Sequence, residues 1–138
     1  MSENAIKFEQ SLKSKGIELE KRVDDYGTTF IVVEIIEGVG PISVGVIFND
    51  NDTIVNIVAY KYLFFDNSEK RQLLLELINT LNIEYTFCKF TEKDNYVTLQ
   101  ISAPFQENFS SDLLTELVFY VYKAIKDEHH RFMEILGK

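Results

Sequence analysis

The chain has 138 residues, 46% of them hydrophobic and 26% charged, which is typical of one folded domain that buries roughly two-thirds of its unfolded surface. Its formal net charge of −8 would repel a phosphate backbone, and its fourteen basic residues are scattered, so nucleic acid is excluded as a partner class. The N-terminus lacks a secretory signal, no run reaches the roughly 18 apolar residues of a membrane span, and the single cysteine fits a reducing compartment. We therefore expect a cytoplasmic protein without membrane contact.

The N-terminal part of the chain predicts a helix followed by a strand. Residues 3–15 carry apolar side chains at helical spacing and end at Gly16, a residue typical of helix stops. Residues 17–23 alternate between apolar and charged side chains, which predicts a strand with one face in solvent. A polar turn over residues 24–27 follows.

The next part of the chain predicts three strands, of which the first and the last are apolar on both faces. They are expected over residues 28–37, 42–48 and 53–65. In the first of them Ile31, Val33 and Ile35 would share one face, and in the last Tyr60 and Tyr62 would share one face. Because the opposite faces are apolar too, we expect both sides of this sheet to be covered.

The central helix is predicted over Ser68–Asn82, and its apolar arc is unusually wide. At about 100° per residue its apolar side chains cover an arc near 200°, whereas a helix facing one core needs somewhat over about 100°. The wide arc indicates two apolar surroundings, the second of which could be a partner subunit. The side chains on this arc are Leu73, Leu74, Leu75, Leu77, Ile78 and Leu81.

The C-terminal part predicts a strand hairpin and a long helix. The strands are expected over residues 84–90 and 95–103 with a turn at 91–94, and the helix from Ser110 or Ser111 to about Leu136. The whole chain thus predicts a single α+β domain over residues 1–138. Its mostly antiparallel sheet would have five or six strands and be accompanied by three helices, in the order α-β-β-β-(β)-α-β-β-α.

The polar motifs do not form a catalytic, metal or cofactor signature. His129 and His130 point about 100° apart on a helix and cannot share a metal as an i, i+4 pair does. Cys88 lies between aromatic residues and is interpreted as a small core side chain. The acidic turn at residues 49–52 lacks the glycine and flanking helices of an EF-hand loop, and residues 38–41 lack the third glycine and following helix of a phosphate cradle. We expect no cofactor and no catalytic residue.

The surplus of apolar and aromatic side chains points instead to contact with another protein. Tyrosine packs its ring while its hydroxyl stays hydrated, a combination favoured at protein interfaces. The residues predicted to contact a partner or a second subunit are Ile31, Val33, Ile35, Tyr60, Tyr62, Leu74, Leu75 and Ile78.

Three segments resemble a known group of proteins. They are Phe65–Asp66 before the central helix, Leu77–Asn82 (LINTLN) at its end, and Tyr85–Phe90 (YTFCKF) after it. With the element order, size and acidity of the chain, they resemble the type III secretion chaperone-like fold, and particularly its YbjN-type sensory-regulator family. The resemblance implies a small, often dimeric protein that binds other proteins, with the central helix contributing to the dimer.

We therefore expect a non-enzymatic, chaperone-like interaction module that forms a homodimer and binds a protein or peptide. Binding could use a groove for apolar segments or an exposed strand edge. The alternative is a small-ligand sensor or enzyme with a pocket between the sheet and the helices.

Overall fold

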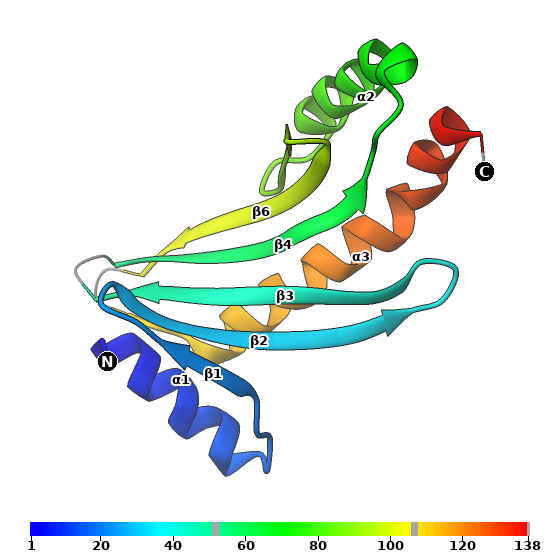
Figure 1. Cartoon of the computed structure of the whole chain (residues 1–138). Coiled ribbons are helices and arrows are strands. Elements are labelled where there is room, and N and C mark those ends of the chain that lie inside the picture. The colour runs from blue at the N-terminus through cyan, green and yellow to red at the C-terminus, as the bar shows by residue number, and fades with distance from the viewer. Residues whose placement is uncertain (51–52, 106–107, 138) are drawn as a thin grey trace.

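The structure is a computed structural model that describes residues 1–50, 53–105 and 108–137. Three α-helices and six strands confirm the predicted α+β class and element order (Figure 1). The elements are α1 (Glu3–Ser14), β1 (Glu20–Val23), β2 (Gly27–Ile36), β3 (Gly40–Asn49), β4 (Ile54–Phe64), a 3₁₀ turn η1 (Ser68–Lys70), α2 (Arg71–Glu84), β5 (Lys89–Lys93), β6 (Tyr96–Pro104) and α3 (Ser111–Leu136). The turn expected at residues 49–52 includes Asn51 and Asp52, which lie outside the described residues.

The six strands form one antiparallel sheet in the order β1-β2-β3-β4-β6-β5. All three helices lie on the same side of it, with α3 running behind β2 and β3 and then visible between β3 and β4 in Figure 1. On that side Phe8 of α1 packs its ring 5.2 Å from the ring of Phe30, and Phe132 of α3 packs 6.0 Å from Phe90. The expectation that both sides of the sheet are covered is wrong, because all three helices pack against the same face of the sheet.

The central helix buries only the middle of its apolar arc within its own chain. Leu74, Leu77, Ile78 and Leu81 of α2 are buried in the same core as Phe90 of β5 and Phe132 of α3. These four residues cover only about 100° of the predicted arc, because Leu73 and Leu75 at its two ends are 51% and 38% exposed.

A bulge in β4 changes which residues share a face. The register of β4 against β6 shifts between Ala59 and Leu63, and Lys61 adopts a left-handed backbone with φ of 51°. Three residues of β4, from Tyr60 to Tyr62, stand opposite the single residue Thr98 of β6, which breaks the alternation locally. Tyr60 therefore faces away from the helices, whereas Tyr62 is buried beneath α3. The prediction that these two tyrosines share a face is wrong for this reason.

The hairpin of β5 and β6 lies later in the chain than predicted. Helix α2 continues to Glu84, and the strand expected over 84–90 is instead Lys89–Lys93. Asp94 and Asn95 form the two-residue turn with φ of 52° and 68°, the conformation of a type I′ hairpin turn. The side chain of Asn82 accepts a hydrogen bond from Phe90 N (2.7 Å) and donates one to Phe90 O (2.9 Å), which fixes the end of α2 against β5.

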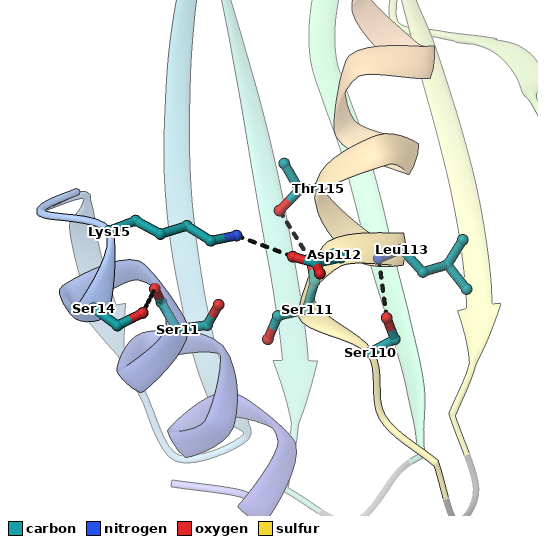
Figure 2. A network of polar contacts seen from close by, with 8 residues as sticks. All are labelled: Ser11, Ser14, Lys15, Ser110, Ser111, Asp112, Leu113 and Thr115. Atoms are coloured by element: carbon teal, nitrogen blue, oxygen red, sulfur yellow. Dashed lines mark hydrogen bonds and ion pairs between the residues drawn. The ribbon is translucent and has the colours of Figure 1, made fainter.

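The long helix α3 begins and ends at residues that cap it. Ser110 Oγ accepts a hydrogen bond from Leu113 N at 3.1 Å, and Gly137 ends the helix in the left-handed conformation. Figure 2 shows this cap beside Lys15, whose Nζ lies 3.0 Å from Asp112 Oδ1 and links the end of α1 to the start of α3. The predicted helix from Ser110 or Ser111 to Leu136 is confirmed.

Candidate interaction surface

The sheet has one face that none of the described helices covers, and we call it the open face. Its members follow from strand alternation, from the register, and from their position opposite the buried set. They are Thr29, Ile31, Val33 and Ile35 of β2; Ser43, Gly45 and Ile47 of β3; Asn56, Val58, Tyr60, Lys61 and Phe64 of β4; and Tyr96, Thr98, Gln100 and Ser102 of β6. On the two margins lie Glu20 and Arg22 of β1, and Lys89, Thr91 and Lys93 of β5.

The open face is nearly free of charge between its margins. Lys61, at the bulge, is the one charged side chain among its members on β2, β3, β4 and β6, although 26% of the chain is charged. Its ammonium lies 4.9 Å from the centre of the Tyr96 ring, which shields it in a cation–π contact. The middle of a protein interface is depleted of charge in the same way.

One end of the open face is strongly apolar and accessible. Val33 is 58% exposed, Ile35 81% and Tyr60 62%. Phe64 is also exposed and packs its ring 5.0 Å from that of Tyr96 at the same end. These residues form two groups, one on β2 and one on β4 and β6, because β3 pairs with β4 only up to Gly45 and Val58 and the two strand pairs separate beyond that point. Isolated exposed apolar side chains are ordinary in monomers, but several on one sheet face indicate an interaction site.

The other part of the open face carries polar groups that bond to one another. Gln100 Nε2 donates to Asn56 Oδ1 (3.2 Å) and to Ser102 Oγ (3.1 Å), and Ser102 Oγ donates to Asn56 Oδ1 (2.6 Å). Because these groups already have partners, covering them with another protein leaves few unsatisfied donors or acceptors. The polar cluster is therefore compatible with burial.

Gly45 lies at the centre of the open face, in the interior of β3. A Cβ atom at this position would meet Thr29 Cγ2 at 3.4 Å, an ordinary contact, so the fold of the single chain does not require glycine there. The adjacent Val58 is only 2% exposed and does not rise above its neighbours. A glycine within a strand often marks a place where another backbone approaches closely.

The structure groups half of the predicted contact residues and separates the rest. Ile31, Val33, Ile35 and Tyr60 lie together on the open face. Tyr62, Leu74 and Ile78 are buried in the core of the chain, and Leu75 is 38% exposed on α2, on the helix side of the sheet. The buried three have no free surface to offer a partner.

Sequence reasoning missed Gly45, Ile47 and the cluster of Asn56, Gln100 and Ser102. The alternation of polar residues in β6 was a usable signal, but by itself it indicates only a face away from the core. The register that places these residues in one surface depends on pairing between distant strands.

Two features on the helix side bear on chemistry. Cys88 is 4% exposed, and burial raises the pKa of its thiol to about 12, so it stays protonated at neutral pH and is a poor nucleophile. Within the described ranges, no group of three or more His, Cys, Asp or Glu residues could hold a metal ion.

A depression of about 640 Å³ lies between α1 and β1. Its apolar lining is Leu12, Ile17, Leu19 and Phe30, and its cations Lys13 and Lys21 both pair with Glu9, at 3.8 and 2.8 Å. The hydrogen bond from Lys21 lowers the pKa of Glu9. Both lysines are already engaged, so the depression holds no free cation among its described lining residues.

Comparison with known proteins gave no relative: no family model, no curated protein and no solved structure matches this chain. Of the helices in the described part of the chain, none is sufficiently long and apolar to cross a membrane.

Proposed function

We propose that this protein is a non-enzymatic, chaperone-like interaction module that forms a homodimer through the open face of its sheet. The observation that carries the proposal is an accessible, almost uncharged face, apolar at one end, in a chain of net charge −8. Two copies with the same excess of negative charge repel each other over most of their surfaces. They meet with least repulsion where charges are missing.

The size of the open face suits a dimer. Strands lie about 4.8 Å apart and rise about 3.3 Å per residue, so the four strands from β2 to β6 and the ten residues of β2 cover at most about 19 by 33 Å. Because β3 pairs with β4 only from Gly45 to Phe48, the footprint of roughly 600 Å² per copy and about 1,200 Å² in total is an upper bound, which reaches the lower end of specific stable interfaces.

The proposal includes a cytoplasmic setting and kinship with the secretion chaperone-like fold and its YbjN-type family. The setting is supported by a single, buried, free cysteine, as is usual in reducing compartments. The kinship is supported by the observed order of helices and strands and by the three segments noted in the sequence.

Light scattering at low micromolar concentration tests the dimer. The wild-type chain should have twice the mass of one chain, and Ile35→Lys or Val33→Lys should halve it, because a buried lysine without a partner opposes association. The matched control is Ile83→Lys, since Ile83 is 77% exposed but lies on α2, away from the open face. A monomeric wild type would contradict the proposal.

The depression between α1 and β1 supports a second candidate, a small-ligand sensor or enzyme with its site between a helix and the sheet. Thermal-shift screening against metabolites separates the two. A saturable rise in melting temperature, from a chain that stays monomeric, would favour the sensor over the interaction module.

A further inference from the structure

The register of the sheet aligns six residues in one row across the open face. Reading from β1 to β5, the aligned Cα partners are Glu20, Ile31, Gly45, Val58, Gln100 and Lys89. The row begins with a carboxylate, ends with an ammonium group, and has its midpoint between β3 and β4. A surface with opposite charges at its two ends can be complementary to a second copy of itself.

Symmetry limits how two open faces can meet. A homodimer with a closed interface has a two-fold axis, and for two facing sheets this axis lies in the plane between them. Sheets that pack face to face in the aligned mode keep their strands within about 30° of each other. The axis is then either nearly parallel to the strands or nearly perpendicular to them.

The margins of the sheet distinguish these two arrangements. A perpendicular axis places β5 of one copy over β5 of the other, so that Lys89 and Lys93 face the same two lysines of the partner subunit. A parallel axis reverses the strand order and places β5 over β1 of the partner subunit, where Glu20 and Arg22 form an ion pair of 3.0 Å. Because facing like charges disfavour association, the parallel axis is preferred.

The change in polarity along the strands also favours the parallel axis, independently of the charges at the margins. Val33 and Ile35 of β2 and Tyr60 and Phe64 of β4 lie on the side of the row where β3 and β4 no longer pair, and the cluster of Asn56, Gln100 and Ser102 lies toward the other side. A parallel axis keeps positions along the strands, so the apolar end covers the apolar end of the partner subunit. A perpendicular axis inverts them and would place Ile35 over the polar end.

We propose that the dimer has its two-fold axis parallel to the strands and between β3 and β4, so that Glu20 of each copy lies opposite Lys89 of the partner subunit. This arrangement rests on the proposed function and specifies its partner as a second copy of this chain. Gly45 then lies opposite Val58 of the partner subunit on both sides of the axis. Neither residue rises above its neighbours, so the two sheets can approach closely at their centre.

Cysteine cross-linking in a Cys88→Ala background tests the axis. One of the two variants, Glu20→Cys or Lys89→Cys, is isotope-labelled. A short bifunctional maleimide is added to each variant alone, and also to a mixture of the two after their subunits have exchanged. Mass spectrometry then identifies the linked products. The parallel axis gives linkage between a Glu20→Cys chain and a Lys89→Cys chain, at least tenfold above linkage within either variant alone. Light scattering on the same samples reports whether each variant remains dimeric.

The outcomes separate the axis from the dimer itself. Linkage of Glu20→Cys chains to each other, or of Lys89→Cys chains to each other, would overturn the parallel axis in favour of the perpendicular one. A sample that is dimeric by mass but shows neither kind of linkage would overturn the axis and leave the proposed function intact. A monomeric Cys88→Ala chain, with a wild type that is also monomeric, would overturn the proposed function.

Discussion

The hydroxyl of Tyr62 lies 2.5 Å from Nδ1 of His129, and this contact joins the bulge of β4 to the last third of α3. Burial raises the pKa of Tyr62, so its hydroxyl keeps its proton. When the imidazole is neutral with its proton on Nε2, the hydroxyl donates to Nδ1. The Phe132 ring lies 5.8 Å from the Tyr62 ring and closes the site from the same helix.

We predict that Tyr62→Phe lowers the free energy of unfolding by about 1 kcal/mol, because one partly buried hydrogen bond is lost while the ring stays in place. Urea denaturation at pH 7.5 measures this. Tyr60→Phe is the matched control, since Tyr60 is exposed on the opposite side of the sheet, and it should leave the unfolding midpoint of a monomeric Ile35→Lys chain unchanged.

The same contact predicts how stability depends on pH. Burial lowers the pKa of His129 below its ordinary value near 6.5. Below that value the unfolded chain binds the proton more readily than the folded chain, so the free energy of unfolding should fall as the pH drops from about 7 to about 5. Glu37, Lys126, His130 and Glu134 lie around the same shallow depression and add their own charges.

Comparison with His129→Asn isolates this effect, because the variant keeps the other charges and removes the titrating ring. The wild-type chain should lose more stability than His129→Asn between pH 7 and pH 5. Parallel curves for the two proteins would show that His129 titrates equally in the folded and unfolded chains.

A second stability prediction concerns Asn82, whose two hydrogen bonds to the backbone of Phe90 fix α2 against β5. Asn82→Ala should lower the free energy of unfolding by about 2 kcal/mol, about 1 for each bond. Asn79→Ala is the control, since Asn79 is exposed on the same helix, and it should be neutral or slightly stabilising through helix propensity. Chemical denaturation of both variants provides the comparison. If Asn82→Ala and Asn79→Ala lowered the free energy of unfolding equally, the hydrogen bonds of Asn82 to Phe90 would not stabilise the fold as predicted.

Asn82 and Lys61 also show which features of the fold could not be predicted from the sequence. The period of two in β6 and the 3.6-residue period of the apolar stripe of α3 are both local sequence patterns, and both elements were predicted correctly. The segment 84–90 is rich in aromatic residues that favour strands, but helix α2 continues to Glu84 and a contact between Asn82 and Phe90 sets the start of β5. Such a contact between two elements has no local pattern.

The sequence predicted only part of the open face, because the rest of it also depends on contacts between elements. Ile31, Val33 and Ile35 share a face by simple alternation, and the structure keeps them together. Tyr62 does not share a face with Tyr60 because β4 is irregular between Ala59 and Leu63, where Lys61 has a left-handed backbone, and no local sequence signal predicts this irregularity. The wide arc of α2 suggested a partner subunit; the core of the chain covers its middle part, from Leu77 to Ile78, and leaves Leu73 and Leu75 exposed.

Gly45 offers a prediction in which stability and association change in opposite directions. In a monomeric Ile35→Lys chain, Gly45→Val should raise the free energy of unfolding by about 0.5–1 kcal/mol, because valine favours strands and a Cβ finds only ordinary contacts there. In the wild-type background the same change should weaken the dimer at least tenfold, since it adds bulk where the sheets approach. Denaturation and analytical ultracentrifugation measure the two effects. An unchanged dimer would place Gly45 outside the interface.

Charge reversal at the margins provides the last prediction. Glu20→Lys places two ammonium groups face to face at each end of the proposed dimer and also removes the pairing with Arg22, and Lys89→Glu places two carboxylates there. Charges at an interface rim contribute little individually, so each variant should raise the dissociation constant only severalfold, up to about tenfold, and the effect should fade in high salt.

The double variant Glu20→Lys/Lys89→Glu restores opposite charges at both ends of the row. Its dissociation constant should return to within about twofold of the wild-type value, because each new lysine again faces a carboxylate of the partner subunit. Sedimentation at low and high salt measures all four proteins. Additive weakening in the double variant would mean that Glu20 and Lys89 do not meet across the interface, because independent sites keep their separate effects whereas facing charges compensate each other.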